Sequence, residues 1–276
     1  MRRNIIMNSK QTVSLPLKSV NNARELGGYK TSDGKSVKHG LLLRTGRLDN
    51  ITDEDIAILR DRYRLGQIVD FRMAMELAGS DDPTIDGVGY HHLDVIDPSV
   101  FGSMNADIDI SNFDLIQMTE MTIKSGMLNE KMYIGFLESD FGKKAFSEFF
   151  SILLDTEPGR AVLWHCTSGK DRTGLAAMLL LSALGVDEKT VMEDFLLTND
   201  YNAERIAATR RYLTEKRFEE GFINKALLIF DSVDQSFMSS AIDHLKKNYG
   251  SVEGYIINRL NIKQNDLNIL RNKYLD

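Results

Sequence analysis

The residues best suited to chemistry lie in one short segment, AVLWHCTSGKDRTG, which runs from Ala161 to Gly174. It holds Cys166, the only cysteine of the 276-residue chain, and Arg172 follows six positions later. A cysteine thiolate is a strong nucleophile, and the planar guanidinium of arginine matches two oxygens of a phosphate group. The spacing therefore predicts that Cys166 attacks the phosphorus of a bound phosphate ester and forms a phosphocysteine intermediate.

This chemistry needs a strand and a helix to hold the loop between them. Residues 161–164 predict a short buried strand, and residues 175–181 predict a buried helix that ends at Gly185. Unpaired N–H groups at such a helix start favour a bound anion and the thiolate form of Cys166. We therefore expect the phosphate to be bound by the loop residues, namely Thr167, Ser168, Gly169, Lys170, Asp171 and Arg172.

Several neighbouring residues are predicted to support the loop. The Thr173 hydroxyl can donate to the thiolate and hold it as the leaving group when the intermediate is hydrolysed. His165 is expected to fix the loop by hydrogen bonds rather than to act as a base. Arg44 and Arg47 flank a glycine turn, where they either contact substrate phosphate or form structural ion pairs, and we favour ion pairs.

The reaction also needs a general acid to protonate the leaving oxygen. We assign this role to Asp97, which precedes a proline on a loop that leaves a predicted strand, although a turn aspartate would look the same. Asp171 is the rival because it lies within the phosphate loop. The other candidates are Asp94 and Asp70, of which Asp70 ends a buried strand and is expected to anchor the backbone or Arg72.

The composition excludes several classes of function. The chain has 42% hydrophobic and 27% charged residues and a net charge of −6, which disfavours binding to nucleic acid. No run of 18 apolar residues and no signal-peptide core is present, so we expect a cytoplasmic protein, or one secreted without a recognisable signal peptide. The neighbouring His91 and His92 alternate across a predicted strand and cannot chelate one metal together, and we expect no cluster of metal ligands elsewhere. We therefore expect no metal and no cofactor.

Strands and helices alternate before the loop, and only helices follow it. Further strands are predicted at residues 41–44, 66–71 and 89–95, and Thr52 is predicted to cap a helix. Arg72 and Glu76 follow the second of these strands at a spacing that permits a helical ion pair. Residues 112–156 are predicted to be helical with a break near Gly126. After Gly185 the predicted helices cover residues 187–197, about 203–247, 251–258 and 264–275. The fold class is therefore α/β, with a central mixed sheet flanked by helices in a single domain over residues 1–276.

Six blocks of the sequence carry a resemblance to a known family. They are NNARELGGY (21–29), LLLRTGRLDNIT (41–52), IVDFR (68–72), HCTSGKDRTG (165–174), DFLLTNDY (194–201) and YGSVEGYI (249–256). In this order they resemble the atypical bacterial tyrosine and lipid phosphatases, best known as secreted phosphatases of mycobacteria and Listeria. The chain departs from the pattern at Ala23, where an aromatic residue is usual.

The resemblance implies a cysteine-phosphatase fold, no metal, an acid at Asp97 and a helical lid within residues 199–245. It also implies activity on phosphotyrosine proteins and, in some members, on phosphoserine, phosphothreonine or phosphoinositides. The pair Lys170 and Asp171 is similar to basic loop residues of phosphoinositide phosphatases, where extra positive charge meets extra phosphates. A charged pair on a loop is more often merely solvated, but inside this loop we favour a functional role. We expect a monomer that acts on a phosphorylated protein or a phosphoinositide. The alternatives are a catalytically silent phosphate-binding module and a sulfur-transfer protein.

Overall fold

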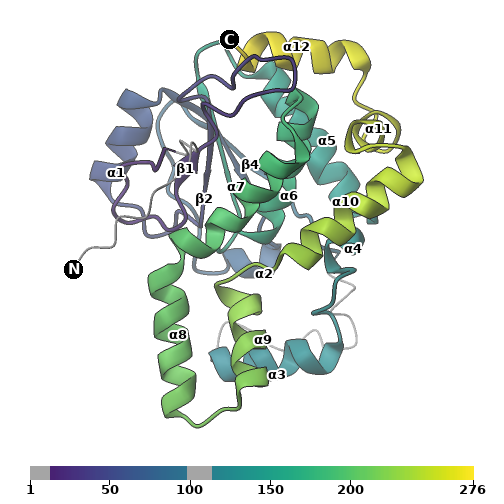
Figure 1. The fold of residues 1–276 in the computed structure, drawn as a ribbon. Coiled ribbons are helices and arrows are strands. Elements are labelled where there is room, and N and C mark those ends of the chain that lie inside the picture. The colour runs from purple at the N-terminus through teal and green to yellow at the C-terminus, as the bar shows by residue number, and fades with distance from the viewer. Residues whose placement is uncertain (1–12, 98–113) are drawn as a thin grey trace, which may run out of the picture.

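A computed structural model describes residues 13–97 and 114–276 and shows a central sheet with helices on both faces (Figure 1). The strand order is β1-β2-β5-β3-β4, in which β1 is antiparallel to β2 and the other neighbours are parallel. The strands are β1 (Arg24–Glu25), β2 (Leu42–Thr45), β3 (Leu65–Asp70), β4 (Gly89–His92) and β5 (Ala161–His165). The expected α/β class with a mixed sheet is confirmed.

The predicted strand before the cysteine is β5, which occupies the centre of the sheet. All five of its residues are buried, as a strand covered on both faces requires. Trp164 packs edge-to-face against Phe149, with ring centroids 5.4 Å apart, and Phe149 packs in the same way against Phe71. This aromatic cluster fixes the strand that leads into Cys166.

Helices form the rest of the described chain. Before β5 they are α1 (Asp53–Ala57), which continues as the π-helical turn η1 (Ile58–Arg62), α2 (Ala74–Leu77), α3 (Leu115–Ser125), α4 (Met132–Glu138) and α5 (Asp140–Asp155). After β5 they are α6 (Asp171–Leu184), α7 (Glu188–Tyr201), α8 (Ala203–Glu215), α9 (Glu220–Phe230), α10 (Gln235–Tyr249), α11 (Val252–Asn258) and α12 (Gln264–Tyr274). No helix in these ranges is long and apolar enough to span a membrane.

Local signals in the sequence place several helix ends correctly. The Thr52 side chain accepts a hydrogen bond from the Asp55 N–H at the start of α1. Gly126 and Gly185 end α3 and α6 in the left-handed conformation. Two predicted spans were too coarse, because residues 203–247 divide into α8, α9 and most of α10, and the 112–156 span divides into three helices. Residues 112 and 113 lie outside the described part of the chain.

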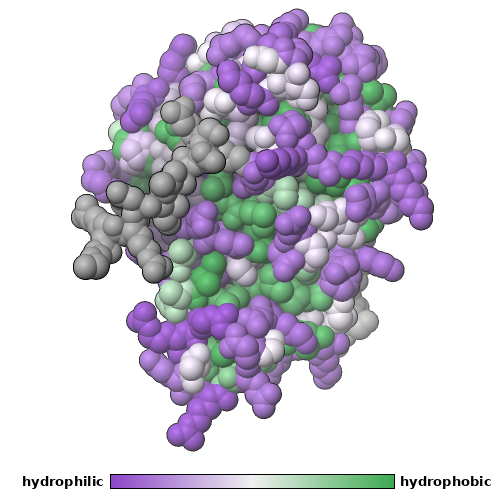
Figure 2. All heavy atoms as spheres, viewed as in Figure 1, coloured by the Kyte–Doolittle hydropathy of each residue, from purple (hydrophilic) through white to green (hydrophobic). Residues whose placement is uncertain are grey.

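Three helices form a separate group with an apolar cluster of their own. In Figure 1, α3, α8 and α9 lie together below the sheet. Their cluster contains buried residues of α8 and α9 and partly buried residues of α3, namely Leu213, Ile223, Ala226, Leu227, Leu115 and Ile116. On the face shown in Figure 2, apolar residues gather between the main body and the outer ends of α8 and α9.

Candidate active site

The loop that carries the cysteine joins the carboxyl end of β5 to the first turn of α6. Cys166 is a free thiol with only 2% of its surface exposed. Gly169 has a φ of +66°, and a Cβ at this position would lie 2.3 Å from the Thr45 carbonyl oxygen. Glycine is therefore required at this point of the loop, because any side chain would collide with the end of β2.

Donor groups next to β2 hold the loop by hydrogen bonds to its backbone carbonyl oxygens. The Thr167 carbonyl accepts from the Arg47 N–H at 3.1 Å, and the Asn22 side-chain amide donates to the carbonyls of Ser168 at 3.3 Å and Gly169 at 2.8 Å. In a planar trans peptide the N–H points away from the carbonyl. The N–H groups of residues 168–170 therefore point to the opposite side, and they donate to no other described residue. Such successive N–H groups form a nest for an anion.

Arg172 is held by a carboxylate that the sequence did not reveal. Its guanidinium forms a two-pronged ion pair with Glu76 of α2, at 2.5 Å from Nη1 to Oε2 and 2.9 Å from Nη2 to Oε1. Nη1 also donates to the Phe71 carbonyl at 3.1 Å. Glu76 also accepts from the Thr167 hydroxyl and from the Met73 N–H, so that one carboxylate joins α2, the loop and Arg172.

This pair corrects an expectation from the sequence. Arg72 and Glu76 are four residues apart, a spacing that would allow a helical ion pair, but α2 begins only at Ala74 and the two side chains have other partners. Burial alone would raise the pKa of Glu76, but the Arg172 guanidinium and the hydrogen bonds lower it to about 2. Glu76 is thus ionised at neutral pH and keeps the Arg172 guanidinium in place.

A buried group of two carboxylates, a guanidinium and an imidazole lies beside the loop. Arg72 bridges Asp70 at 2.6 Å and Asp82 at 2.8 Å, and Nε2 of His165 lies 2.7 Å from Asp82. Asp70 therefore anchors Arg72, as expected from its place at the end of β3. Nδ1 of His165 contacts the Cys166 carbonyl oxygen at 3.2 Å. We call Asp70, Arg72, Asp82 and His165 the histidine cluster.

The histidine cluster also contains ligand types that bind metals. Atoms of Asp70, Asp82 and His165 lie within 4.8 Å of one another, although we expected no ligand cluster. The Arg72 guanidinium already bonds to both carboxylates and balances part of their charge. Burial alone would lower the pKa of His165, but Asp70 and Asp82 raise it above its usual value. Arg72 thus supplies a positive charge to both carboxylates, and His165 is the third side chain around them.

A second buried group lies behind the loop, on the side of β1 and β2. Arg24 and Arg44 face each other across the two strands, and Asp194 of α7 accepts from Arg24 Nε at 3.0 Å and from Arg44 Nη1 at 2.5 Å. Arg44 Nη2 donates to the Gly169 carbonyl at 3.0 Å. All three side chains are almost fully buried. We call Arg24, Arg44 and Asp194 the arginine cluster. Arg47 instead pairs with Asp49 at 3.1 Å, near the surface.

The two charged residues of the loop contact other parts of the chain. Nζ of Lys170 donates to the carbonyls of Leu228 at 2.7 Å and Ser232 at 3.2 Å, and it pairs with Asp171 at 2.9 Å. The Asp171 carboxylate also accepts from the Tyr133 hydroxyl at 2.5 Å. The Ser168 hydroxyl donates to the Phe230 carbonyl at 3.1 Å. The loop is therefore tied to the end of α9 and the turn that follows it.

Thr173 has the one loop hydroxyl that is buried without a partner among the described residues. Its Oγ1 forms no hydrogen bond, while its carbonyl accepts from the Trp164 indole N–H at 3.2 Å. A buried hydroxyl without a partner costs free energy, which a bound group would recover. The hydroxyl is therefore available for the role at the thiolate that we expected from the sequence.

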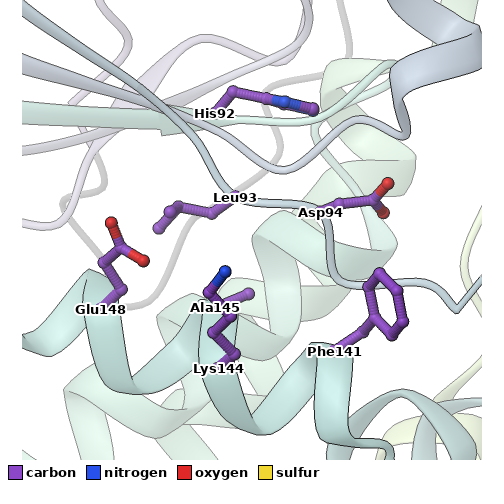
Figure 3. A pocket seen from close by; sticks show the side chains of 7 residues that line it. All are labelled: His92, Leu93, Asp94, Phe141, Lys144, Ala145 and Glu148. Carbon is purple, nitrogen blue, oxygen red and sulfur yellow. The ribbon is translucent and has the colours of Figure 1, made fainter.

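A cavity of about 170 Å³ lies beside the carboxyl end of β4. Figure 3 shows Lys144 and Glu148 on α5, below the segment that carries Leu93 and Asp94. The lining residues are His92, Leu93, Asp94, Phe141, Lys144, Ala145 and Glu148. Burial raises the pKa of Asp94, despite hydrogen bonds from the N–H groups of Ile96 and Ala74. Asp97 follows three residues later, partly exposed, as the last described residue before position 114.

Comparisons with known proteins agree with this geometry. The model of a family described as the tyrosine phosphatase family matches residues 15–276. A "putative tyrosine-protein phosphatase" of Cupriavidus necator is 28% identical over 95% of this chain and 88% of its own length. The "triple specificity protein phosphatase PtpB" of Mycobacterium tuberculosis is 24% identical over 80% of this chain and 86% of its own.

Proposed function

Because the chain belongs to the tyrosine phosphatase family, we propose that it hydrolyses phosphomonoesters through a phosphocysteine intermediate on Cys166. One observation carries this proposal. The loop around Cys166 directs three successive N–H groups away from β2 while Glu76 holds the Arg172 guanidinium in place. The N–H groups and the guanidinium together supply the donors that the three non-bridging oxygens of a phosphoryl group need.

The proposed reaction has two steps. The Cys166 thiolate attacks phosphorus, the bond from phosphorus to the ester oxygen breaks, and Asp97 protonates the departing oxygen. Water then attacks the phosphocysteine and gives a proton to the Asp97 carboxylate, the bond from phosphorus to sulfur breaks, and inorganic phosphate, the thiolate and the acid form of Asp97 result. The free hydroxyl of Thr173 donates to the sulfur as it leaves. No step in this scheme uses a metal or a cofactor.

We propose phosphotyrosine proteins as the substrate class, with phosphoserine, phosphothreonine and phosphoinositides as further substrates. A Mycobacterium tuberculosis relative is named a triple specificity phosphatase, which supports a broad range. Lys170 would contact an additional phosphate only after it exchanges the carbonyls of Leu228 and Ser232 for that phosphate. We further propose that residues 199–245 act as a lid, since the turn after α9 lies on the loop.

The Cys166→Ser variant tests the proposal, because a serine hydroxyl is not ionised at neutral pH while the anion site is kept. Turnover of p-nitrophenyl phosphate should fall below detection, and binding of inorganic phosphate, measured by calorimetry, should persist. Residual turnover within about tenfold of the wild type would refute the nucleophile, since about tenfold corresponds to only ~1.4 kcal/mol of barrier. Phosphate binding by a wild type without turnover would instead identify a silent phosphate-binding module.

The general acid is tested by a pair of variants. Asp97→Asn should slow a phosphoserine peptide by about 10²–10⁴-fold and p-nitrophenyl phosphate much less, because only poor leaving groups need the proton. Asp171 bonds to Tyr133 and Lys170, so Asp171→Asn should disturb the loop and slow both substrates about equally. If the dependence on the leaving group appears only in Asp171→Asn, the two roles must be exchanged.

A further inference from the structure

The arginine cluster carries more positive than negative charge. Two guanidinium groups face one carboxylate, which leaves one positive charge in excess within the protein interior. Arginines directly opposite each other on neighbouring strands repel, so this arrangement costs stability. Burial and the neighbouring Arg24 lower the pKa of Arg44 only to about 10, so Arg44 is still protonated at neutral pH.

The remaining charged groups near Cys166 are paired with opposite charges. Arg172 pairs with Glu76, and Lys170 pairs with Asp171, whose carboxylate also accepts from Tyr133. In the histidine cluster the two carboxylates lie around Arg72 and the His165 imidazole, so this cluster carries no positive charge in excess whether or not the imidazole is protonated. Asp94 faces Arg172 from beyond β4 and makes hydrogen bonds to the backbone. Within the described residues around the loop, the arginine cluster is therefore the group with an unmatched positive charge.

The excess charge reaches the loop through a direct bond. Arg44 donates to the Gly169 carbonyl, the same oxygen that accepts from Asn22. Asn22 in turn accepts from Arg24 through its side-chain oxygen, so both arginines are linked to one carbonyl of the loop. Tyr29 donates to Asp194 at 3.1 Å, and the Arg24 guanidinium lies over the Tyr201 ring at 5.2 Å from its centroid.

We propose that Arg24, Arg44 and Asp194 form a positioning group that stabilises the Cys166 thiolate from behind the loop, by one buried excess charge and by orientation of the Gly169 peptide. This inference rests on the proposed function, because it assumes that Cys166 reacts as a thiolate. The three residues do not contact the substrate in this role. They act through the Gly169 carbonyl and through the electrostatic field at the loop.

The test uses the fact that the chain has one cysteine, so that alkylation by iodoacetamide reports on Cys166 alone. The alkylation rate is measured against pH for the wild type and for charge variants. Arg24→Met removes the excess charge and keeps the bond from Arg44 to Gly169. It should move the pH midpoint upward by about one unit, as expected for one charge on the order of 10 Å away at an effective dielectric constant of about 20.

Two further variants separate charge from structure. Asp194→Asn increases the excess to two positive charges and should move the midpoint downward. The double variant Arg24→Met/Asp194→Asn again has one excess charge and should return close to the wild type, although it has lost more bonds than either single variant. A purely structural role predicts instead that the double variant is the most disturbed.

The results of the alkylation experiment separate a failure of the proposed function from a failure of this inference. A wild-type midpoint at the ordinary cysteine value of about 8.5 would contradict the proposed function itself. A low wild-type midpoint that does not move in the folded variants, or that moves the same way in both single variants, would overturn this inference alone. Arg271→Met is the matched control, since Arg271 pairs with Glu253 and bonds to Ala183 at the other end of α6. If this control folds and both single variants do not, the cluster is a folding element and the inference is wrong.

Discussion

The arginine cluster and the histidine cluster lie on opposite sides of the same loop, and both are buried ionic groups. The arginine cluster joins two guanidinium groups to one carboxylate, and it contains no imidazole. The histidine cluster joins two anions to one guanidinium and one imidazole, so its balance depends on a proton. The two clusters therefore differ in how the electrostatic field that each exerts on the loop responds to pH. The field of the histidine cluster depends on the protonation of His165, and the arginine cluster has no such group.

The largest expected difference between the two clusters is in stability. Arg72→Met would leave Asp70 and Asp82 buried with only the His165 side chain beside them, at a cost of about 3–5 kcal/mol in the free energy of unfolding. Arg24→Met should cost less, because Arg44 and Asp194 remain as a neutral pair. Urea unfolding of the two variants measures both values, and equal losses would show that the clusters do not differ in this respect.

A smaller effect is expected from Glu76, which lies on the side of the histidine cluster. Its pKa is lowered from 4.5 to about 2, so its contribution is complete above pH 4.5 and is lost as the pH falls toward 2. The difference corresponds to a contribution on the order of 3 kcal/mol. The free energy of unfolding is measured between pH 5 and pH 2.5, and its slope against pH reports the number of protons taken up on unfolding. This slope should be shallower for Glu76→Gln than for the wild type. Asp140→Asn, at a side chain that is 96% exposed, should keep the wild-type slope.

The smallest effect is expected on the alkaline side, from His165. Because its pKa is raised in the folded protein, it contributes stability below its usual value of 6.5 and loses that contribution as the pH rises through the raised value. The free energy of unfolding of the wild type should thus decline relative to that of His165→Gln above neutral pH. His91→Gln, a change at a histidine that bonds to Gln67, should retain the decline. A difference between the wild type and His165→Gln that does not change with pH would show that His165 is not the titrating group.

Short-range patterns were enough to predict the elements around the nucleophile. The apolar run before Cys166 and the apolar run after Thr173 identify β5 and α6, since both are buried on all sides and have clear ends. The side-chain cap at Thr52 and the left-handed glycine at Gly185 also follow from local chemistry. These features depend on residues within a few positions of one another, which is the range over which a sequence pattern has physical meaning.

Partners that are far apart in the chain could not be predicted. Glu76 and Arg172 are 96 positions apart, and the local spacing pointed instead to Arg72. Arg24 meets Arg44 only through the register of β1 on β2, and Asp194 reaches both from a helix 150 positions beyond Arg44. The block that contains Asp194 supported the family resemblance but indicated no role for the residue. The assignment of Asp97 as the acid remains a prediction.

The contacts between the loop and the turn after α9 have a consequence for how sequence change is tolerated. Ser168 and Lys170 bind the carbonyl oxygens of Leu228, Phe230 and Ser232, and no side chain of these three residues takes part in the bonds. Every amino acid supplies the same carbonyl group, so substitutions at positions 228, 230 and 232 leave this recognition chemically unchanged. In a scan of single substitutions, changes at positions 228, 230 and 232 should therefore be tolerated by this contact, whereas changes at Ser168 and Lys170 should weaken it. Positions 228, 230 and 232 can therefore vary while the attachment to the loop is kept, whereas Asp231 between them is buried and bonds through its side chain to Arg205 and Thr209.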